Sequence, residues 1–267
     1  MNGGASGGGR TPATVGDGWR VIRRPETVST NLDVLDLARS GDPGRVWVVA
    51  ERQTGGRARR GREWTSETGN LYASALVIDP CFPAHLPELP FVAALAAHRA
   101  VTRLLGGGVG GIGLKWPNDL MIGGRKVAGI LLESSRTPDG RTAVAVGIGI
   151  NCRHHPPATE TPATSLSAEG AEVLPERLFG ELARAFAEIY ALWDDGRNFA
   201  SIRRAWIEAA IGIGGPVRVR LVDGEDHGTF EAIDEAGLLV LARADGTRRL
   251  VSAGDVFFPA TGVGEER

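Results

Sequence analysis

Three segments of the sequence combine charged and amide side chains with glycines, a combination suited to binding an anionic ligand. They are residues 53–64 (QTGGRARRGREW), 114–134 (LKWPNDLMIGGRKVAGILLES) and 147–151 (GIGIN). Arginine stays charged and binds phosphate oxygens in pairs, and glycine lets a loop backbone approach a ligand closely. From its composition alone, the first segment could grip a nucleic-acid backbone, cradle the phosphates of one nucleotide, or face solvent.

The charge balance of the whole chain weakens the first of these interpretations. The 267 residues carry a formal net charge of −2, with 42% hydrophobic and 23% charged residues. A generic nucleic-acid binder usually has a basic excess, so the arginines of residues 53–64 are a local feature. The length suits one large domain, or a medium domain with a small second one.

Lys115, Asn118 and Asp119 surround a proline in the second segment. Lys115 ends a predicted strand at residues 112–116, and Pro117 takes the chain out of it. We therefore expect Asn118 and Asp119 in the turn that follows. Functional groups of α/β sheets are often presented in this way at strand ends, although a lone lysine there is most often solvated.

Other familiar motifs are absent or stand in the wrong context. The glycine string at residues 106–113 contains G-x-G-x-x-G, but it follows a predicted helix and precedes a strand, the reverse of a dinucleotide site. We expect a flexible loop there. His154 and His155 lack a metal-ligand spacing, and the sequence has neither a P-loop nor a G-x-S-x-G elbow.

Hydrophobic periodicity predicts the elements that must position the three segments. Residues 29–41 are predicted to form a helix because Leu32, Leu35 and Ala38 recur at helical spacing, and polar side chains at 29–31 offer capping oxygens. Further helices are predicted at residues 88–105, 175–193 and 198–210. Strands are predicted at residues 45–50, 71–78, 112–116, 127–134 and 143–151, with irregular loops at 53–64 and 153–166.

The composition changes near residue 213. Short strand-like runs at 217–222, 228–233, 238–243 and 248–253 alternate with tight turns, which is typical of a small antiparallel barrel. We therefore expect a mixed α/β domain over residues 19–212 and a barrel over residues 213–260. Residues 1–18 are rich in glycine and have little to bury, so they are predicted to be a disordered tail, as are residues 261–267.

The two cysteines, Cys81 and Cys152, form no C-x-x-C pair and suggest no disulfide framework, so a reducing cytoplasm is the expected setting. The first residues have no apolar signal region, and no apolar run approaches the length of a membrane span. We expect a soluble protein that is not exported.

In this order and at these separations, the three segments resemble the biotin protein ligase family. The resemblance runs from about Val21 to Pro259 and includes residues 250–259 (LVSAGDVFFP) near the end of the chain. It implies an α/β (α+β) fold, a mixed β-sheet flanked by helices like the class II synthetase-like catalytic domain of biotin and lipoate ligases, followed by an SH3-like β-barrel. The implied reaction has two steps: biotin and ATP form biotinyl-5'-AMP, and a lysine of a biotin carboxyl carrier domain then takes the biotinyl group.

The resemblance also implies roles for individual residues. Lys115 is expected to contact the biotin carboxyl and the α-phosphate and is the first catalytic candidate, with Arg57 and Arg59. A carboxylate at Asp119 suits Mg²⁺, which prefers oxygen ligands. The residues implied in binding ATP or the adenylate are Arg57, Arg59, Arg60, Gly61, Trp64, Asn118 and Asn151. The residues implied in binding biotin are Ser29, Thr30, Asn31, Gln53, Gly129, Ile130 and Leu131.

The family reading fixes the expected ligands and partners as well. ATP, Mg²⁺ and biotin are expected to bind, and the protein partner is the carrier domain of biotin-dependent carboxylases. No nucleic acid or membrane partner is expected, and the chain should be a monomer or a weak homodimer. Fewer than 30 residues precede Ser29, too few for the winged-helix domain of family members that repress transcription.

One residue departs from the family pattern, and two alternative functions remain open. Family members commonly have G-R-G-R in the arginine loop, where this chain has Ala58; if that position needs a positive φ, alanine costs about 1 kcal/mol. The alternatives are a lipoate or octanoate ligase of the same fold and a non-enzymatic regulator that binds nucleic acid through its arginines. A ligase would transfer its acyl group to a carrier lysine, whereas a regulator would show salt-dependent binding without turnover.

Overall fold

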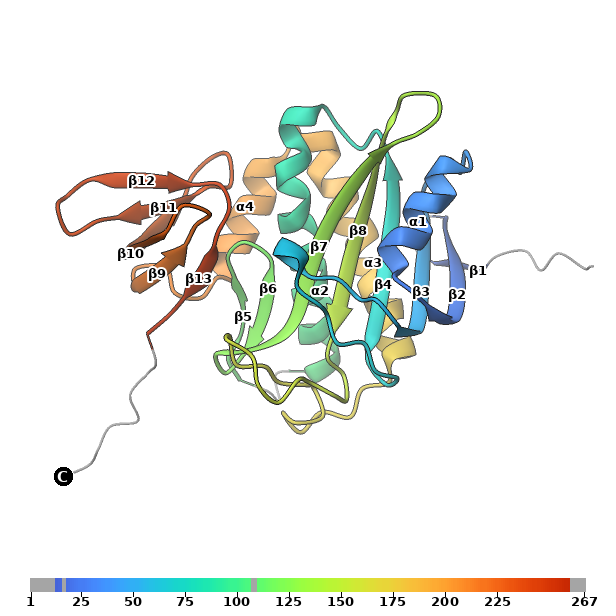
Figure 1. Ribbon diagram of the computed structural model, residues 1–267, viewed down its shortest axis with the longest axis horizontal. Helices are drawn as coiled ribbons and strands as arrows, with labels where there is room; N and C mark the ends of the chain where they lie inside the picture. The colour runs from blue at the N-terminus through green and yellow to red at the C-terminus, as the bar shows by residue number, and fades with distance from the viewer. Residues whose placement is uncertain (1–12, 16–17, 107–109, 260–267) are drawn as a thin grey trace, which may run out of the picture.

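An eight-stranded mixed β-sheet forms the centre of the computed structural model, which describes residues 13–15, 18–106 and 110–259 (Figure 1). The strands are β1 (Ala13–Val15), β2 (Trp19–Thr27), β3 (Val46–Gln53), β4 (Leu71–Ile78), β5 (Ile112–Lys115), β6 (Asp119–Ile122), β7 (Arg125–Arg136) and β8 (Thr142–Ile150). Their spatial order is β1-β2-β3-β4-β8-β7-β6-β5. The pair β2 and β3 is parallel, and the other neighbours are antiparallel. The mixed sheet expected from the sequence is thus confirmed.

Helices cover the two faces of this sheet unequally. They are α1 (Thr30–Arg39), α2 (Leu89–Leu105), α3 (Pro175–Trp193) and α4 (Phe199–Glu208), with 3₁₀ turns at Arg59–Gly61, Pro83–Glu88 and Asp194–Gly196. Because side chains of a strand alternate between faces, Val46 and Val48 of β3 pack with α1. Trp47, between them, turns to the other face and meets Phe179 and Phe186 of α3 at ring-centroid distances of 5.7 and 5.2 Å.

The face that carries α1 becomes open further along β8. Ala143 and Ala145 lie under the helix, and the next two residues on that face are Gly147 and Gly149. In the pairing register, Gly147 lies opposite Leu131 and Gly149 opposite Gly129 of β7. Along β8, the residues on this face thus change from alanine to glycine at the N-terminal end of α1, which leaves a shallow backbone floor there.

The hairpin of β5 and β6 corrects one expectation about the second segment. Residues 116–118 form the turn, but Asp119 is the first residue of β6 and pairs with Lys115 across the hairpin. The prediction that Asp119 lies in the turn is therefore wrong. β6 itself was not predicted, because its four residues directly follow a proline turn and offer too short a pattern for periodicity to detect.

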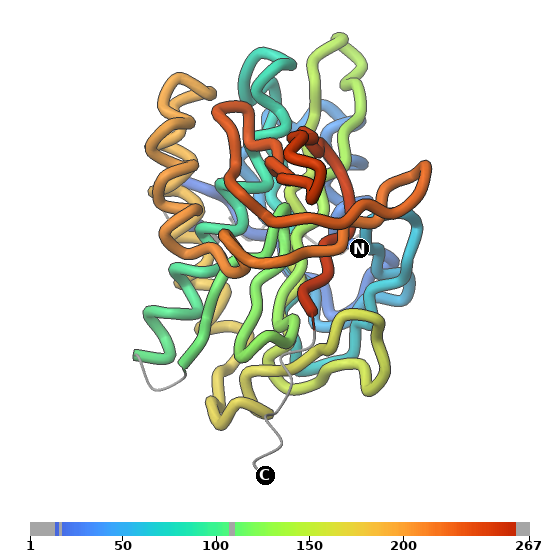
Figure 2. The backbone as a smooth tube through the Cα atoms, turned by 90° about the vertical axis from the view of Figure 1, so that its left-hand side faces the viewer, coloured from blue at the N-terminus to red at the C-terminus, as the bar shows by residue number. Residues whose placement is uncertain are grey.

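The C-terminal residues form a second, five-stranded antiparallel sheet. Its strands are β9 (Pro216–Arg220), β10 (Glu225–Ile233), β11 (Leu239–Ala242), β12 (Arg248–Val251) and β13 (Asp255–Phe257), in the order β12-β11-β10-β9-β13. A small antiparallel β-domain was predicted and is confirmed, but among the described residues no pairing closes β12 onto β13. Figure 2 shows this sheet (orange to red) beside the β5–β6 hairpin. Trp116, in the turn of that hairpin, donates a hydrogen bond from its indole Nε1 to the carbonyl of Gly237, between β10 and β11, at 3.0 Å.

Two further expectations are corrected at the N-terminal side. Residues 13–15 form β1 on the edge of the sheet, so the predicted disordered tail does not extend over them; its remaining residues 1–12 and 16–17, like the predicted tail at 261–267, lie outside the described residues. Ser29 is the N-cap of α1, but its side chain makes no capping hydrogen bond. The predicted glycine loop at 106–113 does join α2 to β5, with residues 107–109 outside the described part.

Candidate active site

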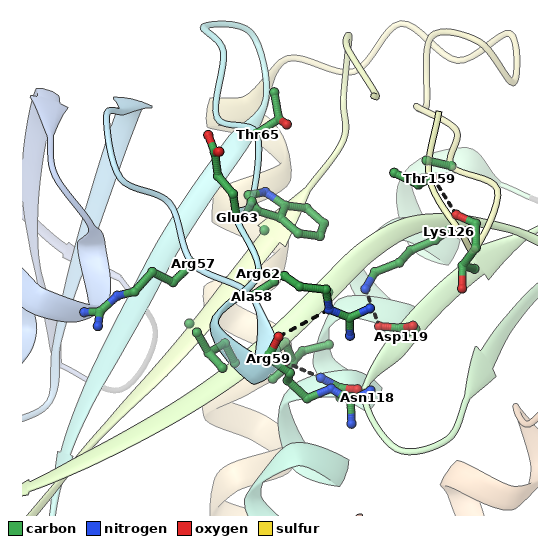
Figure 3. A pocket seen from close by; sticks show the side chains of 18 of the residues that line it. Arg57, Ala58, Arg59, Arg62, Glu63, Thr65, Asn118, Asp119, Lys126 and Thr159 are labelled. Carbon is green, nitrogen blue, oxygen red and sulfur yellow. Dashed lines mark hydrogen bonds and ion pairs between the residues drawn. The ribbon is translucent and has the colours of Figure 1, made fainter. Parts of the chain in front are cut away.

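A cavity of about 400 Å³ opens on the glycine floor beside α1 (Figure 3). Its size falls within the range of small-ligand sites. The three sequence segments, the 153–166 loop and strand β13 all contribute to its walls. Of the predicted site residues, Arg60 and Gly61 do not line it; those that do are Ser29, Thr30, Asn31, Gln53, Arg57, Arg59, Trp64, Lys115, Asn118, Asp119, Gly129, Ile130, Leu131 and Asn151.

One end of the cavity holds a connected set of polar side chains. Gln53 Oε1 accepts hydrogen bonds from the backbone N–H and hydroxyl of Thr30 at 2.9 and 3.1 Å. The buried Ser74 hydroxyl lies 2.7 Å from Thr30 Oγ1 and 2.6 Å from Asn31 Oδ1. Asn31 Nδ2 donates to the Leu131 carbonyl and to Glu133 Oε2, at 3.2 and 2.8 Å. Each amide is therefore held in one orientation, which provides a fixed pattern of donors and acceptors for a polar ring.

Glycines bring other groups close to the floor of the cavity. A Cβ on Gly147 would lie 2.3 Å from Asn31 Oδ1, and one on Gly149 would lie 2.7 Å from the Trp64 indole. The indole therefore lies flat over Gly149 and Gly129, with the Lys126 ammonium 5.4 Å from its ring centre. Its buried Nε1 has no hydrogen-bond partner among the described residues. Trp64 thus brings an aromatic ring to the wall of the cavity.

The other end of the cavity contains a cluster of two lysines and a buried carboxylate. Lys126 Nζ lies 2.6 Å from Asp119 Oδ1, and Lys115 Nζ lies 3.7 Å from Asp119 Oδ2. Lys115 and Asp119 are 5% and 6% exposed, so their charges are largely removed from water. Lys115 Nζ also donates to Thr161 Oγ1 at 3.4 Å. A buried carboxylate between two ammonium groups can fix the position of each of them.

Burial and neighbouring charges shift the pKa of both buried groups. Burial lowers the pKa of Lys115 below its usual value; Asp119 opposes that shift, and Lys126 and Arg59 add to it. Burial favours the neutral form of Asp119, but Lys126 and Lys115 outweigh this effect and hold the Asp119 pKa below its usual range. The carboxylate is therefore ionised at neutral pH, and Lys115 loses its proton more readily than a free lysine would.

Three arginines of the loop converge on one carboxylate of the second sheet. Asp255 Oδ1 lies 2.9 Å from Arg59 and 3.1 Å from Arg62, and Arg60 lies 3.4 Å from Asp255 Oδ2. Arg60 also donates to the Arg220 carbonyl at 3.0 Å, so it faces the second sheet rather than the cavity. Arg59 and Arg62 do line the cavity, as do Lys115 and Lys126, so four cations gather near Asp119 and Asp255, an arrangement that suits an anionic ligand.

Arg57 lies apart from the other arginines of the loop. Its Nη1 is 3.2 Å from Glu133 Oε1, at the polar end of the cavity, and Figure 3 shows the side chain directed away from Asp119 and Lys126. Lys115, Arg57 and Arg59 were expected together as catalytic candidates, but the structure places Arg57 apart from the other two. Ala58 next to it has φ −119° and ψ 175°, an extended conformation that any residue adopts, so it carries no backbone strain.

The two asparagines implied in nucleotide binding have different surroundings. Asn118 donates to the Ile130 carbonyl, and its buried Oδ1 has no partner among the described residues, which leaves an acceptor for a ligand. Asn151 Nδ2 donates to the Thr164 carbonyl at 3.0 Å. Asn151 therefore also holds the 153–166 loop in place.

Several residues in and around the cavity were not identified from the sequence. Lys126 lies within the second segment, so its place in a buried ion pair could have been suspected from the alternation of β7. Glu133 lies in the same segment, and Asp255 and Phe257 lie in residues 250–259, but nothing in the sequence indicated that these three side chains reach the site. Ser74 gave no signal at all. Asp255 and Arg59 are 196 residues apart in the chain, and only the packing of the two sheets brings them together.

A magnesium site at Asp119 does not fit the surroundings of its carboxylate. Its two oxygens face Lys126 and Lys115, at 2.6 and 3.7 Å, which occupies the positions that a cation would take. Within residues 13–15, 18–106 and 110–259, no three acidic, histidine or cysteine side chains gather as a metal site. We therefore interpret Asp119 as the counter-ion of the two lysines.

Family models match both parts of the chain. Residues 21–151 match the biotin/lipoate A/B protein ligase family, and residues 212–258 match the biotin protein ligase C terminal domain. Among curated proteins, a biotin–[acetyl-CoA-carboxylase] ligase of Paracoccus denitrificans is 44% identical over 239 residues, which cover 87% of this chain and 98% of that protein.

Solved structures show the same relationship. A biotin protein ligase of Aquifex aeolicus, in complex with biotin and ATP, aligns with a TM-score of 0.74 at 26% identity, over 89% of this chain and 97% of that one. A biotin protein ligase of Leishmania major, in complex with biotinyl-5-AMP, aligns with a TM-score of 0.60 at 25% identity, over 91% and 100%. The chain therefore belongs to the biotin protein ligases of the biotin/lipoate A/B protein ligase family.

Proposed function

We propose that this protein joins biotin to ATP as biotinyl-5'-AMP and then transfers the biotinyl group to a lysine of a biotin carboxyl carrier domain. The observation that carries this proposal is the arrangement of one cavity, with fixed polar groups at one end and four cations at the other. The first end suits a ureido ring, which needs both donors and acceptors. The second suits the phosphates of a nucleotide.

In the first step, an oxygen of the biotin carboxylate attacks the α-phosphorus of ATP. The bond from that phosphorus to the β-phosphate oxygen breaks, and pyrophosphate leaves with the electron pair. Two anions must approach each other, so fixed positive charge lowers the barrier if it is better placed for the transition state than for the substrates. We assign this role to Lys115 and Arg59, with Lys126 and Asp119 holding the lysine in position.

In the second step, the neutral amine of the carrier lysine attacks the acyl carbon of the mixed anhydride. The bond from that carbon to the phosphate oxygen breaks, AMP leaves, and the new amide loses a proton to water. The same cations stabilise the AMP that departs. We assign Trp64 and Asn118 to the adenylate, because the indole presents an aromatic face and each residue has a buried polar atom without a partner among the described residues.

At the other end of the cavity, we assign Thr30, Asn31 and Gln53 to the ureido group of biotin, with Leu131 and the backbone of Gly129 beside its apolar part. Arg57 belongs to this end in our proposal, through its ion pair with Glu133. Magnesium has no protein ligand in this scheme; the phosphates of ATP provide its oxygen ligands.

The lowered pKa of Lys115 gives the proposed reaction a defined pH dependence. The cationic form of Lys115 is the one that binds phosphate, and its pKa lies below the usual value for lysine because the side chain is buried. We expect kcat/KM for adenylate formation to fall with rising pH at a lower pH than a free lysine would cause. Pyrophosphate release measured across the alkaline range tests this expectation.

The variant Lys115→Arg is the control for that profile. Arginine stays protonated throughout the alkaline range, so the residual activity of this variant should not show the alkaline decline. A decline at the same pH in both proteins would assign the titration to another group.

A direct assay tests the proposed function. The protein is incubated with ATP, Mg²⁺ and an apo carrier domain, with either biotin or lipoate, and the carrier mass is measured. We expect one biotinyl group on the carrier lysine and pyrophosphate release that depends on biotin. Modification by lipoate alone would favour the second candidate ligase, and no transfer of either acyl group would overturn the proposal.

The proposed function also implies a protein partner, an assembly and a location. We propose carrier domains of biotin-dependent carboxylases as the protein substrate, a monomer or weak homodimer as the assembly, and no nucleic-acid partner. Among the helices that the structure describes, none combines the length and apolar character needed to cross a membrane. A cytoplasmic location is supported by Cys81 and Cys152, which are both free thiols.

A further inference from the structure

Two separate loops over the cavity are tied to the C-terminal sheet. Residues 53–64 reach Asp255 of β13 through their arginines, and residues 153–166 reach Arg220 of β9 through Glu160. Asp255, Val256 and Phe257 also line the cavity directly. The C-terminal sheet therefore forms one wall of the site and holds the two loops that complete it.

The 153–166 loop is fixed at both ends, and its middle depends on this tie. At its start, Asn70 Oδ1 accepts hydrogen bonds from the backbone N–H groups of Arg153 and His154, at 2.9 and 3.0 Å. Near its end, Pro162 accepts a hydrogen bond from the Lys126 N–H at 2.7 Å, and the Thr164 N–H donates to the Lys126 carbonyl at 2.9 Å. These backbone bonds attach residues 162–164 to β7. Between the two ends, the chain is held by the Glu160 carboxylate, which accepts from both terminal nitrogens of Arg220, one of them at 2.9 Å. Glu160 thus sets where the cavity side of the loop lies.

The position of Glu160 matters because of its neighbours in the chain. Thr159 and Thr161 both line the cavity, and the Thr161 hydroxyl accepts from Lys115 Nζ at 3.4 Å. If the Glu160–Arg220 pair separates, this part of the loop can move away from Lys115 while residues 162–164 stay attached. Water then reaches the reacting centre from the side of the C-terminal sheet.

We infer that the Glu160–Arg220 pair is a latch that retains the activated intermediate, and that Glu160 and Arg220 are positioning residues for the reaction. This inference rests on the proposed function. An acyl-adenylate is lost without product when it escapes, or when a water oxygen attacks the acyl carbon and AMP leaves as biotin reforms. Excluding water from such an anhydride is one of the established uses of a closed site.

The chain supplies a matched control for this latch. Arg220 Nε also lies 3.0 Å from Glu225 Oε1, a partner that is next to it on the C-terminal sheet and does not line the cavity. Glu225→Gln therefore removes a carboxylate partner of Arg220 without detaching the loop. Glu160→Gln and Arg220→Gln each remove the latch itself.

The experiment measures two rates in the absence of carrier domain: pyrophosphate release in the first turnover, and later release of biotinyl-AMP and AMP to solution. We expect Glu160→Gln and Arg220→Gln to raise the later rate by about two- to fivefold, the range that exposed ion pairs usually contribute. First-turnover pyrophosphate release should stay near that of the unmodified protein. Glu225→Gln should change neither rate, and the double variant Glu160→Gln with Arg220→Gln should leak no more than the stronger single variant.

The outcomes separate the latch from the proposed function. Equal leakage from all three single variants, multiplied effects in the double variant, or no increase for Glu160→Gln would each overturn the latch. If the unmodified protein releases no pyrophosphate with biotin and ATP, the proposed function itself fails. If the melting temperature of Arg220→Gln falls together with both rates, that variant has a folding defect. The comparison of Glu160→Gln with Glu225→Gln then decides on the latch.

Discussion

Replacing Lys115 with alanine is expected to slow the formation of biotinyl-5'-AMP by about 10²- to 10³-fold, the usual effect of removing one preorganised group that stabilises transition-state charge. The ammonium of Lys115 is buried beside Asp119 and within reach of the bound phosphate in our proposal. Its electrostatic attraction to the phosphate is stronger there than in water, because the effective dielectric constant is lower. The loss should appear mainly in kcat, since the arginines remain to bind ATP.

The fold should tolerate this substitution. Asp119 keeps Lys126 as its partner at 2.6 Å, so the alanine variant leaves no buried carboxylate without a counter-ion. The measurement is first-turnover pyrophosphate release, with the melting temperature recorded beside it. Arg184→Ala serves as the control, because Arg184 is exposed and pairs with Glu181 on α3 away from the cavity. Pyrophosphate release near the unmodified rate would remove Lys115 from its assigned role.

Replacing Gly147 with alanine is expected to raise the KM for biotin by roughly 5- to 150-fold, in line with the usual 1–3 kcal/mol cost of overpacking. The added Cβ would lie 2.3 Å from Asn31 Oδ1 and 2.9 Å from Asn31 Cγ. Asn31 cannot move aside without breaking its hydrogen bonds to Ser74, Leu131 and Glu133. The ureido end of the cavity should therefore lose its geometry while the cationic end keeps its own.

Steady-state kinetics with biotin and ATP varied separately test this prediction, because the KM for ATP should change little. Gly180→Ala is the matched control: Gly180 lies in α3, and an added Cβ would meet nothing within 4 Å. That substitution should leave both KM values unchanged and slightly stabilise the helix. An unchanged biotin KM in the Gly147 variant would show that Asn31 does not bind biotin.

Local sequence patterns were sufficient for the helices, for most of the long strands and for the location of the site. The eight-residue strand β4 was predicted with its observed ends, and the helix at 175–193 matches α3, because long periodic segments are fixed by burial of one face. The short strands β1, β6 and β13, of three or four residues, were not predicted, because they owe their existence to pairing partners elsewhere in the chain. The nine-residue strand β2 was not predicted either, because its second half is polar and exposed and breaks the apolar alternation. The three segments that resemble the family all reach the cavity.

The assignment of individual roles needed the three-dimensional arrangement. By sequence, the arginines of residues 53–64 form one group, yet Arg57 pairs with Glu133 at one end of the cavity while Arg59, Arg60 and Arg62 meet Asp255. Asp119 was expected to hold a metal and instead lies between two lysines. Residue type fixes what a side chain can bind, but its neighbours decide what it does bind.

The sequence by itself therefore determined the family, the mixed sheet and the segments that carry the chemistry. Each of these depends on residue types and on spacing within a short stretch, where periodicity and glycine content constrain the backbone directly. The tertiary structure decided which carboxylate faces which cation, and it showed that the C-terminal sheet contacts both loops over the cavity through Asp255 and Arg220. Such contacts join residues far apart in the chain, and their geometry follows from how the two sheets pack, which no local pattern encodes.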